Sequence, residues 1–143
     1  MSLSRREILA GSAGAAAFGA LPYRSAKAQA ANTIRIGVLN DMSGMYRDIS
    51  GMSSVVCARA AVQEFAGRGF NVEVLSADHQ NRADVGVNIA RQWIDREGVD
   101  VLLDVTTSSV ALAVSDICRE KNKVHINCSA ATSDLTGARC NAN

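Results

Sequence analysis

Apolar and polar positions follow two different periods along residues 34–65. Residues 34–39 form a short apolar run with β-branched side chains, which predicts a first strand. A turn-rich segment follows at residues 40–51. Beyond it, apolar residues recur at the spacing of an α-helix, at Val55, Val56, Ala60, Ala61 and Phe65. Gly67 and Gly69 predict that this helix ends there.

The same alternation continues toward the C-terminus. We expect strands at residues 71–77, 99–105 and 124–128. Helices are expected between them, at residues 84–98 and 110–120. The helix that begins near Asp84 has an apolar stripe at Val87, Ala90, Trp93 and Ile94. The strand at 99–105 is a nearly continuous apolar run, which is typical of a strand covered on both faces.

This order of elements predicts an α/β fold, a parallel sheet with helices on both faces and right-handed crossovers. Ligands of such open sheets bind outside the carboxyl ends of the strands. We therefore expect a ligand near three loops, at residues 41–51, 106–109 and 129–133.

Residues 1–30 have the features of an export leader. Arg5 and Arg6 follow Ser4 and precede a mildly apolar stretch at 8–21, and small residues follow. The paired arginines predict a twin-arginine-type signal peptide, with cleavage after Ala28 or Ala30. The apolar stretch is shorter than the roughly 18–20 residues of a membrane span. A buried N-terminal helix is the alternative. Residues 31–143 are then one exported domain.

Charge argues against two classes of partner. The leader contains four of the 15 basic residues and one of the 14 acidic residues, so the remainder carries 11 basic and 13 acidic residues. A slightly acidic domain without a basic run argues against nucleic acid and against an anionic membrane as partners. We also expect no membrane insertion after leader removal.

The four cysteines do not form a metal motif. No CxxC occurs, and neither His79 nor His125 has the spacing to complete a metal site, so we expect no metal or other cofactor. Cys57 on a helix and Cys128 in a strand are interpreted as small buried apolar side chains. Export allows disulfides, and Cys128 has two candidate partners in Cys118 and Cys140, between which spacing does not decide.

Hydroxyl groups gather in two of the expected ligand loops. Residues 106–109 read Thr-Thr-Ser-Ser between a strand and a helix, where hydroxyls and unpaired helix N–H groups can hold a carboxylate. Capping by Ser108 or Ser109 explains only one of the four. Residues 129–134 again combine small side chains with hydroxyls, although an ordinary loop has the same composition. Tyr46, in the first loop, offers an aromatic ring for stacking on a ligand or for packing over the loop.

Catalytic motifs are absent from the sequence. There is no GxSxG, no GxxxxGK and no GxGxxG after the first strand. An exported hydrolase using Asp78, Asp104 or Ser108 is the remaining enzymatic alternative. We therefore predict a binding protein and not an enzyme.

Several stretches, taken in order, resemble one protein family. They are residues 34–44, 76–85, 108–114, 119–123 and 133–137. Together they resemble the type I periplasmic solute-binding proteins of ABC transporters, in the group that takes branched-chain amino acids, amides or urea, and aromatic acids. The resemblance covers residues 34–140, so it is more specific than any one motif.

The resemblance implies a function. A two-lobed periplasmic protein, monomeric when complete, would close on a small solute and deliver it to an ABC permease. A ligand-sensing regulatory lobe of the same fold is the alternative. Residues 31–143 would form a truncated N-terminal lobe, because the family continues beyond Asn143 into a second lobe.

The resemblance also implies where the solute binds. Ser108, Ser129 and Ala131 match its carboxylate-binding positions, and Tyr46 matches a position near the cleft. Amino-acid binders commonly have threonine where this chain has Ala131, which argues against an amino-acid ligand. The complete set of expected ligand-binding residues is Tyr46, Thr107, Ser108, Ser129, Ala130 and Ala131.

Overall fold

The computed structural model describes residues 33–65 and 67–143. The expected signal peptide lies outside these residues. The described elements are β1 (Thr33–Asn40), α2 (Gly51–Glu64), β2 (Asn71–Asp78), α3 (Ala83–Gln92), the π-helical turn η1 (Trp93–Glu97), β3 (Val101–Leu103), α4 (Ser108–Lys121), β4 (Val124–Ile126) and the 3-10 turn η2 (Ser133–Leu135). No helix within the described residues is long and apolar enough to cross a membrane.

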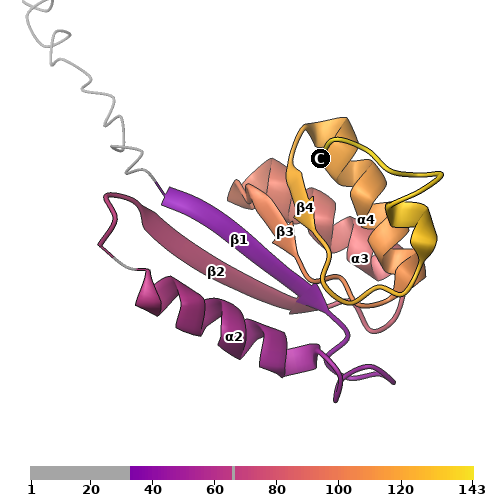
Figure 1. Cartoon of the computed structure of the whole chain (residues 1–143), viewed down its shortest axis with the longest axis horizontal. Coiled ribbons are helices and arrows are strands. Elements are labelled where there is room, and N and C mark those ends of the chain that lie inside the picture. The colour runs from indigo at the N-terminus through magenta and orange to yellow at the C-terminus, as the bar shows by residue number, and fades with distance from the viewer. Residues whose placement is uncertain (1–32, 66) are drawn as a thin grey trace, which may run out of the picture. The chain divides into compact units, whose positions relative to one another are not determined.

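All four strands are parallel, in the order β2-β1-β3-β4. The chain moves one way across the sheet from β1 to β2 and the other way from β2 to β3 and β4. Right-handed crossovers therefore place α2 on one face and α3 with α4 on the other, as Figure 1 shows. The prediction of a parallel α/β sheet with helices on both faces is confirmed.

The apolar core lies between the sheet and the α3–α4 pair. Leu39, Leu102, Val110 and Val114 are fully buried there. Trp93, only 5% exposed, packs across β1 at a position that requires glycine, because a Cβ on Gly37 would lie 2.5 Å from the Trp93 ring.

The face of the sheet that carries α2 is only partly covered. Val124 and Ile126 of β4 are 46% and 49% exposed, and Val56 of α2 and Phe65, which follows α2, are 60% and 49% exposed. Of the apolar positions that recur at helical spacing between residues 55 and 65, only Val55 is buried. The expected two-sided cover of the third strand is complete on one side only, because Leu102 is fully buried whereas Val101 and Leu103 are half-buried.

The third and fourth strands are shorter than predicted. β3 ends at Leu103 because Asp104 takes a left-handed backbone conformation, with φ of 55°, that an extended strand does not accommodate. β4 ends at Ile126, which leaves Cys128 outside it.

The interpretation of Cys57 and Cys128 as buried apolar side chains is wrong, because both are exposed. Cys118 is the buried thiol, and burial raises its pKa to about 12. All four cysteines lie among the described residues and are free, so neither Cys118–Cys128 nor Cys128–Cys140 is paired.

Candidate functional site

The carboxyl ends of β1, β3 and β4 meet at one edge of the sheet. We call this the carboxyl edge and define it as residues 40–50, 104–110 and 127–132. β3 and β4 pair in register at Leu103 and Ile126, so the loops that follow them lie side by side. Ser108 and Ser129 are both half-buried there and reach solvent. The structure thus brings two of the expected ligand-binding residues to the same edge.

A buried carboxylate holds this edge together. Asp104, 7% exposed, accepts hydrogen bonds from Asn40 at the end of β1, from Ser54 in α2 and from Ser129 after β4. The Asn40 Nδ2 to Asp104 Oδ2 distance is 3.1 Å. Each donor comes from a different segment, so one side chain connects β1, α2 and the loop after β4. The hydroxyl hydrogen of Ser129 is committed to this bond.

Two of the four hydroxyls at 106–109 also serve the protein itself. Thr106 is buried; its Oγ1 donates to Asn40 Oδ1 at 2.9 Å and contacts the Ser50 hydroxyl. Thr107 donates to Asn81 Oδ1 at 2.8 Å. Thr107 is the N-cap residue of α4, yet its side chain makes no cap hydrogen bond. The alternative that Ser108 or Ser109 caps this helix is therefore wrong.

The first turn of α4 presents backbone donors at the edge. The first backbone hydrogen bond of the helix joins Ala111 N to Thr107 O at 2.8 Å. The N–H groups of Ser108, Ser109 and Val110 precede it and have no helical acceptor. Together with the positive end of the helix dipole, such groups favour a carboxylate. A carboxylate at this position needs no basic side chain.

The loop after β4 is held in place by Asn127. Its Nδ2 donates to Val105 O at 2.7 Å, and its Oδ1 accepts from Ala130 N at 2.9 Å. The Ala130 side chain packs against the core. Ala131 is exposed. Ala130 therefore anchors the loop, and Ala131 carries the side chain that faces outward.

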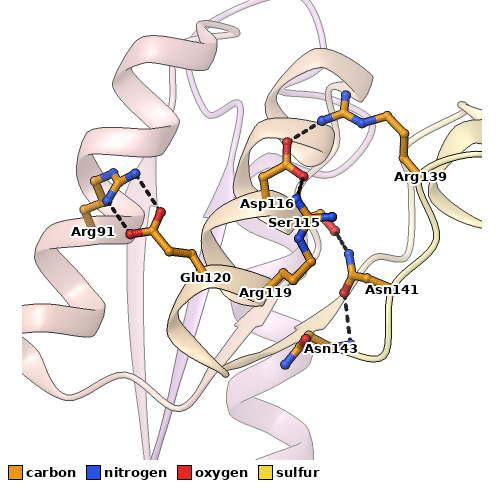
Figure 2. A network of polar contacts seen from close by, with 8 residues as sticks. All are labelled: Arg91, Ser115, Asp116, Arg119, Glu120, Arg139, Asn141 and Asn143. Carbon is orange, nitrogen blue, oxygen red and sulfur yellow. Dashed lines mark hydrogen bonds and ion pairs between the residues drawn. The ribbon is translucent and has the colours of Figure 1, made fainter.

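The segment that follows this loop is fastened to α4, as Figure 2 shows. Arg139 forms an ion pair with Asp116, and Asn141 Nδ2 donates to Ser115 Oγ at 2.9 Å. These contacts fix the C-terminal end of the stretch from β4 to Asn143.

The first loop is built around two carboxylates. Buried Asp41 accepts from the backbone N–H groups of Gly44 at 2.7 Å and Tyr46 at 3.0 Å. Asp78 accepts from Met42 N at 3.0 Å. Partial burial raises the pKa of Asp78, but hydrogen bonds from Ser43 and from backbone N–H groups outweigh it and leave the pKa below its ordinary value. The Tyr46 side chain is half-buried in this loop.

The two aspartates considered as candidates for a hydrolase already accept hydrogen bonds within the protein. Both oxygens of Asp104 accept hydrogen bonds, and Asp78 Oδ1 accepts from two backbone N–H groups. His79 is fully buried and burial lowers its pKa; its Nδ1 accepts from Asn81 N at 3.1 Å. These contacts shape the loops instead of forming a nucleophile and its base.

A hollow lies away from this edge, on the α2 face of the sheet. It has a volume of about 410 Å³ and is lined mainly by apolar side chains, including Ile36, Val62, Phe65, Phe70 and Leu103. It shares no residue with the carboxyl edge.

The chain resembles known proteins over almost all of its described length. A model of a family described as periplasmic binding protein matches residues 33–143. No curated protein matches the chain.

Solved structures agree with the family match. A periplasmic binding protein from Burkholderia mallei is 41% identical over 76% of this chain, with a TM-score of 0.73. A branched chain amino acid ABC transporter periplasmic ligand-binding protein from Burkholderia xenovorans is 39% identical over 76% of this chain, with a TM-score of 0.72. A solute-binding protein from R. palustris in complex with 4-hydroxybenzoate is 27% identical over 73% of this chain, with a TM-score of 0.66. The matched parts span 30%, 29% and 29% of those three chains.

Proposed function

This chain belongs to the periplasmic binding protein family, and from that premise we propose that it forms the N-terminal lobe of an ABC importer's solute-binding component. The protein acts in the periplasm, reached through the twin-arginine route, and delivers its solute to a permease. The matched structures are more than three times longer than the matched segment, so a second lobe would supply the other wall of the cleft.

One observation carries this proposal. The N–H groups of Ser108, Ser109 and Val110 open onto the carboxyl edge beside the loop at 129–132, and the hydrogen bonds of Asp104 and Asn127 hold both loops in place. Preorganised N–H groups next to small side chains suit a compact anionic group. The solute is therefore a small carboxylate.

A carboxylic acid without an amino group suits this site better than an amino acid does. An amino acid also presents an ammonium group, which requires nearby oxygen acceptors. The Asp104 oxygens, which could accept from it, already accept hydrogen bonds from Asn40, Ser54 and Ser129. An aromatic acid needs no such partner. The 4-hydroxybenzoate bound by the R. palustris relative has this chemistry.

Two substitutions at one position separate the backbone from the side chain. Ser108 is the first residue of α4, where proline is tolerated because its N–H has no helical acceptor, and Thr107 already has the extended backbone that precedes proline. Ser108→Ala removes the hydroxyl, whereas Ser108→Pro removes the hydroxyl and the N–H.

The test compares 4-hydroxybenzoate, leucine and acetamide by thermal shift on the chain and its two Ser108 variants. We expect 4-hydroxybenzoate to stabilise the chain most and acetamide least. We also expect S108P to weaken the 4-hydroxybenzoate effect more than S108A does. Equal stabilisation by acetamide and 4-hydroxybenzoate, or identical behaviour of the two variants, would contradict the proposal.

A further inference from the structure

Two exposed thiols line one cavity at the back of the carboxyl edge. Cys57 of α2 and Cys128 after β4 both border a cavity of about 330 Å³, together with Ser54 and Asp104. The remaining lining residues are Ser53, Ala58 and Leu103. Nothing in the ligand-binding role described above uses either thiol.

The hydrogen bonds of Asp104 explain why these thiols meet. Ser54 and Ser129 donate to the two oxygens of this one carboxylate, so their hydroxyls lie within a few ångströms of each other. Cys57 follows Ser54 by three residues, which places it on the same helix face about 4.5 Å further along α2. Cys128 immediately precedes Ser129, a step of about 3.3 Å in extended chain.

Both steps lead in the same direction. α2 connects two parallel strands and therefore runs back from the carboxyl edge toward the amino ends of the strands. Moving from Ser129 to Cys128 also leads back along the direction of β4. Exposure alternates along β4, with Val124, Ile126 and Cys128 exposed and His125 and Asn127 less so. Cys128 thus shares the face of Val124 and Ile126, the face that carries α2.

The other two thiols lie elsewhere. Cys118 is fully buried in the core on the opposite side of the sheet. Cys140 follows Arg139, whose guanidinium is paired with Asp116 of α4, so it too lies on the α4 side. Cys57 is therefore the partner that the fold offers to Cys128, a pairing that spacing along the sequence does not indicate.

We propose that Cys57 and Cys128 form a disulfide that ties α2 to the end of β4 when a small-molecule disulfide oxidises the chain. One cysteine thiolate attacks the small disulfide, forms a mixed disulfide and releases one small thiolate. The second cysteine thiolate then attacks the mixed disulfide and releases the other. The protein loses two electrons and two protons, and the small disulfide is reduced to two thiols.

This disulfide would hold together α2 and the loop after β4, the two segments that carry the serine partners of Asp104. It also closes a loop of about 70 residues and so restricts the unfolded chain, which stabilises the folded state. Burial and the nearby Asp104 carboxylate raise the pKa of the Cys128 thiol. Closure is therefore faster at about pH 9 than at about pH 7, because more thiolate is present.

The experiment incubates the chain with oxidised glutathione, maps its peptides without reduction and counts thiols after denaturation. We expect a Cys57–Cys128 cross-linked peptide, a fall from four free thiols to two, and a Tm increase of roughly 8 °C or more. C57S and C128S abolish all three effects. C140S, which removes the other exposed thiol, preserves the cross-link and the Tm increase.

Each alternative result overturns the proposal. A cross-link of Cys128 to Cys140, a stable mixed disulfide with glutathione at Cys57 or Cys128, or unaltered thiols would each show that these two cysteines do not pair. Because both residues are exposed, the serine variants are expected to fold like the parent chain. Equal Tm values of the reduced variants and the reduced parent check this point.

Discussion

At the scale of single residues, Asp104 determines the arrangement of the carboxyl edge. It is a buried carboxylate whose hydrogen-bond partners, among the described residues, are all neutral side chains or backbone. Burying a charge is costly unless donors surround it, and three side-chain donors do so here. Its backbone φ of 55° is tolerated by aspartate and asparagine better than by most other residues.

Asp104→Ala should therefore lower the free energy of unfolding by about 3 kcal/mol or more, because three donors lose their acceptor and alanine is strained at this φ. Urea denaturation measures the effect. Asp116→Ala is the matched control, since Asp116 is a partly exposed ion-pair partner of Arg139 and Arg119. Its loss should be below about 1 kcal/mol. Equal losses in the two variants would mean that Asp104 does not hold the edge.

His125 gives the protein a predictable dependence on pH. Burial lowers its pKa from 6.5 to about 4, and its Nε2 has no partner among the described residues. The unfolded chain therefore binds this proton at a higher pH than the folded chain does. The associated stability is complete above the unfolded value and is lost as pH falls from about 6.5 toward 4.

The loss attributable to His125 is at most about 3 kcal/mol. The pKa of buried His79 is also lowered, so His79 adds to the loss of stability as pH falls. Asp78 and Asp100 have lowered carboxyl pKa values, so the stability that they contribute is lost only at pH values below the range in which the histidines titrate. Urea unfolding at about pH 7 and about pH 4.5 should show a smaller difference for His125→Gln than for the parent chain. An unchanged difference would contradict this assignment.

At the scale of elements, the position of α4 depends on its close packing against α3. Gly86 of α3 is buried, and a Cβ there would collide with Val110 in the first turn of α4. The helix end that offers N–H groups at the carboxyl edge is thus placed by a contact that only glycine permits.

Gly86→Ala should cost about 1–3 kcal/mol by overpacking this contact, despite the better helix propensity of alanine. Asn88→Ala, at an exposed position of the same helix, is the control and should cost nothing. Thermal unfolding distinguishes them. If G86A were as stable as N88A, the two helices would not be held at this distance by Gly86.

The sequence predicts elements where the local pattern is strong. The run at 34–39, the stripe through Ala90 and Trp93 and the strand at 71–77 are all confirmed, because one period dominates each of them. Val56 and Phe65 also follow a helical spacing, yet both side chains are exposed. Local spacing carries no information about which side of a sheet is covered.

The candidate edge was predictable only in part. The topology rule placed Ser108 and Ser129 on one edge, since it depends only on the order of strands. The role of Asp104 was not predictable, because its partners Asn40 and Ser54 lie 64 and 50 residues away in the sequence. The sequence does contain one indication, because Asp104 follows an apolar strand. A carboxylate at such a buried position is unfavourable unless it accepts hydrogen bonds.

At the scale of the whole molecule, the proposed function makes this chain one wall of a two-walled binding site. Its matched segment spans about 30% of the length of the B. mallei relative. The carboxyl edge is an open surface, so a solute gains fewer contacts there than in a two-walled cleft. We expect the chain by itself to bind 4-hydroxybenzoate with a Kd on the order of millimolar. Micromolar affinity by calorimetry would contradict this expectation.

Carboxylate binding at the carboxyl edge is tested most directly by NMR, which detects weak binding residue by residue. Residues 31–143, which form one compact unit, are titrated with 4-hydroxybenzoate while backbone amide shifts are followed. We expect the largest changes at Ser108, Ser109, Val110 and Ala131. Changes confined to the apolar hollow around Phe65 and Phe70, or no changes at millimolar solute, would contradict it.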